Sequence, residues 1–272
     1  MDEYPGKAHM PTAQTANVLV TIPISHYCEK ARWALDRAGV AYREHAHIQA
    51  IHRLATRHAG GGSTAPVLVC AAGVLADSAD ILAWADTQAS PDRALYPDDP
   101  ERAAEVRAQE AEYDTRLGPH SRRWMYQQLR ARRDLAMSYG CVGVPAWERA
   151  MLRLGYPIVI ALVARVLDVT PATAVRSEAE VRTVFDTVGE RLADGRRYLC
   201  GDRFTAADLT FAALAAPVLM PAGYGVPLPA PDELPAHAAE VVRELRAHPA
   251  GAHALRMFDG EREASGRLPA GA

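Results

Sequence analysis

Residues 17–35 read "NVLVTIPISHYCEKARWAL", and this stretch decides the fold of the N-terminal part of the chain. The segment 17–24 is rich in branched apolar residues, as buried strands are, and apolar residues then recur at helical spacing over 26–38 until Gly39. Ser25 stands at the junction, where a hydroxyl can cap a helix. The stretch predicts a strand followed by a helix. It leaves two interpretations of the junction open: a site that handles a thiol, or only a well-capped helix.

The segments that follow predict a small α/β domain over residues 17–90. Strand–helix–strand requires a parallel pair with a right-handed crossover, and a hairpin adds antiparallel strands, so a four-stranded sheet results. The predicted elements after the first helix are a strand at 40–48 ("VAYREHAHI"), an irregular piece at 49–64 whose triple glycine indicates a mobile loop, a hairpin made of "APVLVC" and "GVLAD", and a helix "SADILAWADTQ".

The pattern changes after the segment 91–100, which is rich in proline and aspartate and is interpreted as a linker. Residues 101–262 contain no convincing strand and several helix-like stretches, so an all-helical second domain is predicted. The ends, 1–16 and 263–272, are expected to be flexible tails. The predicted fold class is therefore α/β plus all-α.

Composition excludes several classes of function. A net charge of −3 without a dominant basic face argues against nucleic-acid binding. Four scattered cysteines indicate a reducing compartment rather than disulfides, and the four histidines between residues 45 and 58 lack zinc-type spacing, so no metal is expected. "GYPIVIALVARVLDV" (155–169) is shorter than the roughly 20 apolar residues of a membrane span and predicts a buried helix. With no apolar leader at the N-terminus, we expect a cytoplasmic protein.

Several motifs, in this order, resemble the cytosolic glutathione transferase family over roughly residues 17–260. They are "SHYCEKARWAL", "TAPVL", the pair "DS" at 77–78 and "YLCGDRFTAADLTFAAL". The resemblance implies a thioredoxin-like N-terminal domain, an all-helical C-terminal domain and a homodimer. It also implies glutathione as co-substrate and a hydrophobic electrophile as the second partner.

Ser25 is the candidate for stabilising a bound thiolate. Free N–H groups and the helix dipole favour an anion there by up to about 2 kcal/mol, enough to lower the pKa of a thiol by roughly one unit. Cys28 completes a S-x-x-C pattern, so dithiol exchange is not available, but a thiol in the first helical turn can have a depressed pKa and attack directly. A small residue that faces the core is the alternative interpretation of Cys28.

The resemblance assigns the remaining ligand contacts. A cis peptide bond before Pro66 would present backbone groups to the thiol ligand, and Ser78, expected to cap the next helix, would receive the γ-glutamyl carboxylate beside Asp77. His52, Arg53 and Arg57 are cations available for the other carboxylate, although none matches a family motif cleanly. The full set assigned to glutathione is Tyr27, Ala65, Pro66, Asp77, Ser78, His52 and Arg53, with Ser25 and Cys28 as the catalytic candidates.

In the helical part, Thr205 and Asp208 form a reciprocal capping box that is interpreted as structural. Tyr113 and the run from Trp124 to Tyr126 are interpreted either as a wall of the second-substrate pocket or as core. The region 118–171 is longer than this domain needs. In this it is similar to the membrane-associated prostaglandin E synthase branch, which has a cysteine where Ser25 stands, so the same activity is not expected.

Three functions follow from these observations. The leading one is transfer of glutathione, or a related thiol, to an apolar electrophile. The second is a non-catalytic ligand-binding protein of the same fold, and the third is thiol-dependent reduction or isomerisation through Cys28.

Overall fold

The computed structural model describes residues 17–266, and its N-terminal part is a four-stranded sheet with three helices. The sheet order is β2-β1-β3-β4, with β1 and β2 parallel and the other neighbours antiparallel, which confirms the predicted topology. The elements are β1 (Asn17–Thr21), α1 (His26–Arg37), β2 (Tyr42–Ala46), α2 (His52–His58), β3 (Val67–Cys70), β4 (Gly73–Leu75) and α3 (Ser78–Asp86).

The segment 49–64 differs from its prediction as an irregular loop, because it contains the helix α2. This helix has seven residues, of which only His52 and Thr56 are buried. Two buried residues in two turns do not make a recognisable apolar period, so the sequence pattern missed it. The glycines lie after the helix, in the connection to β3.

The rest of the described chain is helical and has no strand between residues 100 and 266, as predicted. Residues 263–265 continue the last helix instead of starting a flexible tail, and the expected tails 1–16 and 267–272 lie outside the described residues. The elements are η1 (Pro91–Arg93), α4 (Pro100–Glu112), η2 (Tyr113–Leu117), α5 (Gly118–Leu129), α6 (Arg133–Tyr139), α7 (Ala146–Val166), α8 (Pro171–Arg191), α9 (Ala206–Leu219), η3 (Pro231–Glu233), α10 (Ala236–Ala247), α11 (Pro249–Met257), η4 (Phe258–Arg262) and α12 (Glu263–Ser265).

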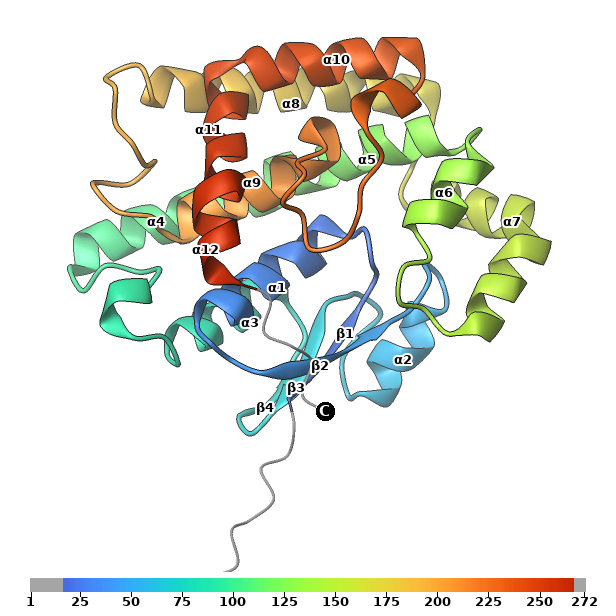
Figure 1. Cartoon of the computed structure of the whole chain (residues 1–272), viewed down its shortest axis with the longest axis horizontal. Helices are drawn as coiled ribbons and strands as arrows, with labels where there is room; N and C mark the ends of the chain where they lie inside the picture. Colours follow the sequence, from blue (N-terminus) through green and yellow to red (C-terminus); the bar gives the residue numbers. More distant parts are fainter. Residues whose placement is uncertain (1–16, 267–272) are drawn as a thin grey trace, which may run out of the picture.

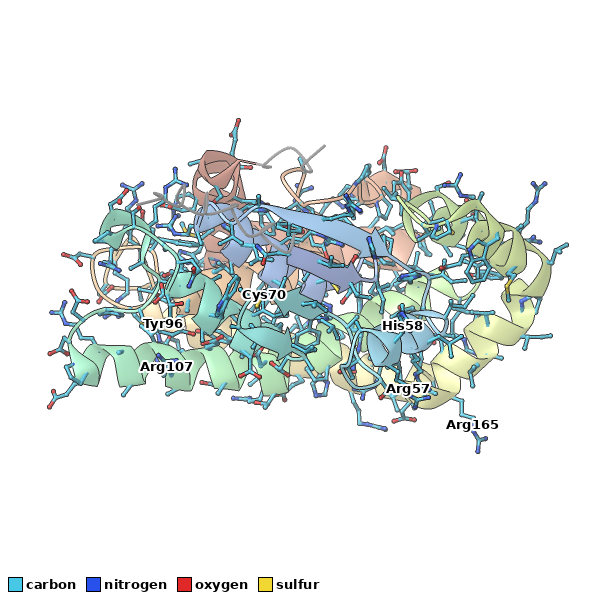
Figure 2. The ribbon with its side chains drawn as sticks, turned by 90° about the horizontal axis from the view of Figure 1, so that it is seen from below. Arg57, His58, Cys70, Tyr96, Arg107 and Arg165 are labelled. Carbon is cyan, nitrogen blue, oxygen red and sulfur yellow. The ribbon has the colours of Figure 1, made fainter. Side chains whose placement is uncertain are left out.

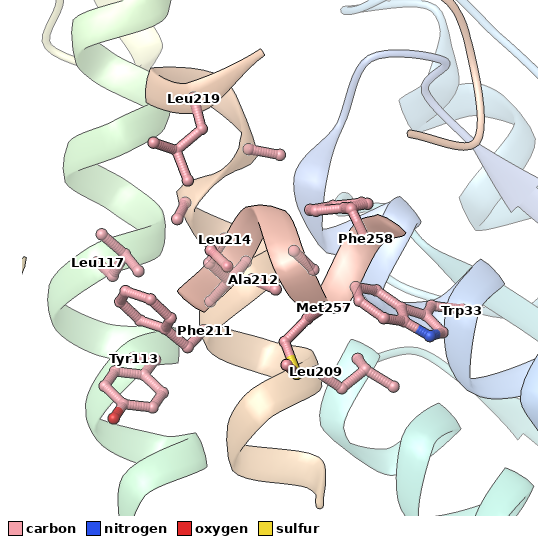
Figure 3. Packing of buried hydrophobic residues seen from close by; sticks show 14 of the residues in the cluster. Trp33, Tyr113, Leu117, Leu209, Phe211, Ala212, Leu214, Leu219, Met257 and Phe258 are labelled. Atoms are coloured by element: carbon pink, nitrogen blue, oxygen red, sulfur yellow. The ribbon is translucent and has the colours of Figure 1, made fainter. Parts of the chain in front are cut away.

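Helix α9 is the centre of the core, and all of its residues are buried. Figure 3 shows Phe211 between Tyr113 and the rest of the cluster, with Trp33 of α1 beside Phe258 on the other side. The predicted capping box is confirmed at its start: Asp208 accepts from the backbone N–H of Thr205 (3.0 Å) and also from that of Leu199 (2.8 Å). The box therefore joins the start of the helix to the loop before it.

Helix α1 connects the sheet to the helical part, and it lies between the sheet and α9 in Figure 1. The Lys30 ammonium is fully buried and pairs with Glu110 (2.9 Å) and Asp114 (2.7 Å). The residue before it, Glu29, pairs with Arg262 at 2.8 Å. Because buried charges need their partners, these pairs hold α1 in one position relative to the helices around it.

Helix α7 contains the stretch that was predicted to be a buried helix, and that prediction is wrong for its outer side. Leu154 is 88% exposed and Ile158 76% exposed. The inner side is attached to the sheet edge by Glu148, which bonds the His47 ring (2.6 Å) and the backbone N–H of Ile48 (2.9 Å). Among residues 17–266, no single helix is long and apolar enough to cross a membrane, although α7 and α8 meet the length and composition test together as a bent pair.

Candidate functional site

Ser25 lies in the connection between β1 and α1, as the sequence predicts. It is half-buried, and its Oγ accepts a hydrogen bond from the backbone N–H of Cys28 (3.4 Å), so it is the N-cap of the helix. The first turn of a helix leaves N–H groups without intrahelical acceptors, and the helix dipole is positive there. This corner is therefore favourable for an anion.

A cleft of about 830 Å³, which includes space open to solvent, runs over this corner. Four of the predicted site residues are brought together on its wall: Ser25, His52, Arg53 and Ala65. The other residues of its lining come from the β1–α1 connection and the start of α1, the connection between β2 and α2, the loop before β3, α5, the end of α7 and α9, namely Ile22, Ile24, His26, Gln49, Ser63, Thr64, Arg122, Met125, Tyr126, Val166, Leu167 and Pro217.

The first two side chains of α1 hold its start against η2 and the beginning of α5. The buried His26 ring has its Nε2 2.8 Å from the carbonyl oxygen of Gly118. Tyr27 donates its hydroxyl to the carbonyl of Asp114 at 2.8 Å, so this predicted ligand residue connects two elements and is not part of the cleft wall. A Cβ on Gly118 would lie 2.2 Å from the Tyr27 oxygen, so only glycine permits this approach.

Arg122 is a residue of the site that sequence reasoning missed. It is half-buried on the cleft wall, and its Nε is buried without a hydrogen-bond partner among the described residues. Its charge contributes to lowering the pKa of His26 to about 3, after the larger effect of burial, so His26 is neutral at neutral pH. No carboxylate in residues 17–266 pairs with Arg122, whose positive charge is thus available to a ligand in the cleft. In the sequence Arg122 is one of two adjacent arginines of an amphipathic helix, which carries no signal for this role.

Two predicted residues have properties that differ from the expectation. The Cys28 thiol is fully buried, accepts from the backbone N–H of Ile22 (3.4 Å) and does not line the cleft. Burial is the largest cause that raises its pKa, and this disfavours a thiolate there. His52 was expected to be a cation, which is wrong at neutral pH, because burial lowers its pKa to about 4. Its Nδ1 accepts from the backbone N–H of Ala50 at 3.2 Å.

At the other predicted contacts, the peptide bond between Ala65 and Pro66 is cis, as the resemblance implies. The cap of α3 is Asp77, whose carboxylate accepts from the backbone N–H of Ala79 at 2.8 Å. The prediction that Ser78 is the cap is therefore wrong: it is the first helical residue, and it is buried. Asp77, Ser78 and Pro66 do not line the cleft around Ser25. Arg57 is exposed on α2.

A second, more apolar pocket of about 510 Å³ adjoins the cleft and shares Ile22, Ile24, Gln49 and Tyr126 with it. Its remaining lining comes from the connection after β2, from α5, from α6 and its C-cap, and from the inner side of α7: Ile48, Leu129, Ala136, Gly140, Leu152, Tyr156, Val159, Ile160 and Val163. Of the residues for which a cleft wall and the core were both open, Met125 and Tyr126 line the cleft, whereas Tyr113 and Trp124 belong to the core. The residues described contain no group of three or more metal-ligating side chains.

Comparisons with known proteins fit this arrangement. Residues 19–93 match the family model "Glutathione S-transferase, N-terminal domain", and residues 145–248 match "Glutathione S-transferase, C-terminal domain". The chain belongs to the glutathione S-transferase family. The region before residue 145 that forms α6 lies outside both matches, and a search of curated proteins finds no match.

Solved glutathione S-transferase structures share the fold. One from Methylobacillus flagellatus KT, with GSH bound, has a TM-score of 0.59 at 14% identity and covers 93% of this chain and 100% of its own. One from Xanthobacter autotrophicus Py2 has a TM-score of 0.56 at 16% identity, with 94% and 96% covered. One from Methylobacterium radiotolerans JCM 2831, in complex with glutathione sulfonate, has a TM-score of 0.51 at 20% identity, with 89% and 95% covered.

Proposed function

We propose that this glutathione S-transferase family member binds glutathione, or a related thiol, as a thiolate near Ser25 and transfers it to an apolar electrophile. The observation that supports this is the cleft over the α1 N-terminus, where the Ser25 hydroxyl and the unpaired Arg122 lie on one wall. In the reaction, the thiolate sulfur forms a bond to the electrophilic carbon, and the leaving group departs with its electron pair. A donor hydrogen bond and a positive charge both lower the pKa of the attacking thiol.

The remaining assignments follow from this position of the sulfur. Ala65 and Pro66 would present backbone groups to the tripeptide, Asp77 and Ser78 at the start of α3 would receive its γ-glutamyl end, and Arg53 its other carboxylate. The adjoining apolar pocket would hold the electrophile. We place this detoxification-type activity in the cytoplasm.

The test is conjugation of glutathione with chlorodinitrobenzene, with the pKa of the bound thiol measured from the ultraviolet absorbance of the thiolate. Ser25→Thr keeps the cap and the hydroxyl, whereas Ser25→Asn keeps the cap but lacks a hydroxyl. We expect Ser25→Asn to raise the pKa of the bound thiol by about one unit and to reduce turnover roughly tenfold below that pKa, with unfolding unchanged. Equal turnover of Ser25→Asn and Ser25→Thr would contradict the assignment.

Arg122→Gln tests the second group, and we expect weaker thiolate formation with the fold intact. Cys28→Ser tests the alternative chemistry, because loss of turnover in this variant alone would assign the reaction to Cys28. The apolar pocket also favours a ligand-binding protein without catalysis. Tight binding of an apolar dye by a protein that does not conjugate glutathione would establish that function instead.

A further inference from the structure

The outer side of α7 carries a continuous apolar stripe. Of the nine large apolar side chains exposed in residues 17–266, six are on this helix. They are spaced by three or four residues, so they fall within an arc of roughly 120° at about 100° per residue. In Figure 1, α7 lies at the edge of the molecule, and no other helix of the described chain covers this side. The six residues of the stripe are Trp147, Met151, Leu154, Ile158, Leu162 and Val166.

The charges that α7 exposes are all positive. Its one acidic residue, Glu148, is fully buried on the inner side of the helix. The exposed charged residues are Arg149, Arg153 and Arg165, and none of them has an ion pair within residues 17–266. The outer side of the helix therefore combines apolar side chains with cations whose charge is not neutralised by the protein.

Helix α2 extends this basic surface to the other side of the cleft. Arg53 lines the cleft, and Arg57 and His58 are exposed. Figure 2 shows Arg57 and Arg165 projecting to the same side of the molecule. Residues 45–76, which include α2, contain no acidic residue. A negatively charged surface could thus approach both helices without meeting a carboxylate on either of them.

An exposed apolar stripe accompanied by cations, without carboxylates beside it, is typical of helices that lie in the plane of a membrane surface. The cytoplasmic side of a bilayer also carries the negative charge that these arginines lack within the protein. We propose that the outer side of α7 binds the surface of a bilayer containing anionic phospholipids, with the helix axis parallel to the membrane plane.

The two ends of the stripe suit such a surface. Trp147 lies in the first turn of α7, and tryptophan is enriched at the level of the lipid headgroups. Arg165 lies in line with the stripe in the last turn and projects away from the body of the protein in Figure 2. A long arginine side chain can keep its methylene groups among apolar neighbours while its guanidinium reaches the phosphates.

The stripe is continuous with the cleft over Ser25. Val166 belongs to the stripe and also lines the cleft, while the inner side of α7 lines the adjoining apolar pocket. Docking of α7 therefore brings one wall of the cleft next to the lipid. An apolar molecule dissolved in the bilayer could then enter the cleft without crossing open water. The docking itself does not depend on the proposed activity.

The first test measures sedimentation of the full chain with vesicles of phosphatidylcholine, with and without phosphatidylglycerol. We expect binding to the mixed vesicles that weakens as salt is added, and little binding to phosphatidylcholine alone. Leu154→Asn should lower the affinity roughly tenfold, because an inserted apolar side chain is lost. Val74→Asn is the matched control. Val74 is also apolar and exposed (42%), but it lies in β4, at the sheet edge opposite to β2, beside which α7 is attached.

The second test measures the contribution of charge with the same vesicles. Arg165→Gln removes the charge but keeps a long polar side chain, and we expect a roughly fivefold lower affinity for the mixed vesicles. Arg107→Gln should leave the affinity unchanged, because Arg107 is an exposed arginine on α4, at the opposite end of the molecule in Figure 2. Thermal unfolding confirms that all variants are folded.

The third test measures insertion through tryptophan fluorescence. Of the four tryptophans, Trp147 is the exposed one, since Trp33 and Trp124 are buried and Trp84 is half-buried. We expect mixed vesicles with brominated acyl chains to quench the emission of the wild-type protein, and Trp147→Phe to lose this quenching.

Four results would overturn the proposal. The first two are absence of binding to the mixed vesicles and equal affinities of Leu154→Asn and Val74→Asn. The third is binding without quenching of Trp147, which would mean that the attraction is electrostatic alone. The fourth is a lower particle mass of Leu154→Asn in light scattering, which would assign the stripe to a protein interface. None of these readouts depends on turnover, so they are separate from the tests of the proposed activity.

Discussion

Gly118→Ala should destabilise the protein and disturb the start of α1, although alanine is the better helix former. The new Cβ would lie 2.2 Å from the Tyr27 oxygen and 2.6 Å from its Cζ, well inside van der Waals contact. The Tyr27 ring cannot easily move away. Its centroid lies 4.5 Å from that of the His26 ring, and its hydroxyl donates to the backbone carbonyl of Asp114. The methyl group therefore has to displace the first turn of α1, where Ser25 lies.

The magnitude follows from three opposing contributions. Overpacking in a tight site costs about 1–3 kcal/mol. Loss of the Tyr27 hydrogen bond costs about 1 kcal/mol, and the better helix propensity of alanine returns up to about 1 kcal/mol. The net expectation is a loss of roughly 1–3 kcal/mol, which for a chain of this size lowers Tm by about 2–4 °C per kcal/mol.

Gly155→Ala is the matched control, measured with Gly118→Ala by urea and thermal unfolding. Gly155 is also helical, but a Cβ there would meet nothing within 4 Å. It should therefore stabilise the protein by up to about 1 kcal/mol. If Gly118→Ala proves as stable as the wild type, or if both variants shift in the same direction, the reasoning from the Tyr27 contact is refuted.

Three further results are expected. Lys30→Met leaves two carboxylates without their buried cation, so it should cost about 3–5 kcal/mol in urea unfolding at neutral pH, and a loss below 1 kcal/mol would contradict the role of that pair. His26→Gln should make the free energy of unfolding less dependent on pH on the acid side. The pKa of His26 is lowered to about 3, below its unfolded value near 6.5, so the unfolded chain binds a proton that the folded chain does not, and stability falls as pH drops through this window, by up to about 1.4 kcal/mol per pH unit. Parallel curves for wild type and variant would exclude this. Glu148→Gln weakens the bond to His47 and should speed hydrogen exchange in α7 while leaving α5 unchanged; equal exchange in both proteins would mean that the helix is held by other contacts.

The parts of the fold that sequence predicted are those with a strong local pattern. The β1–α1 junction and the hairpin of β3 and β4 have regular apolar spacing and clear end signals. The capping box at Thr205 and Asp208 is also a local motif, and it was found for the same reason.

The parts that sequence missed depend on tertiary contacts. Helix α2 is too short to show a helical period of apolar residues. His52 is neutral because the folded chain buries its ring, which lowers its pKa, and the sequence does not reveal that burial. Arg122 enters the site only because α5 approaches α1 at Gly118. The apolar composition of α7 predicts burial, but composition does not say whether the covering surface belongs to the same chain.

The buried ammonium of Lys30 has a practical consequence. The sequence contains two lysines, and Lys30 is the single one within the described residues. Amine-directed labels therefore cannot reach that part of the protein while it is folded, since its side chain is 0% exposed. The rate at which Lys30 is acylated, measured from peptide mass, would therefore report how often the contact between α1 and the helices opens.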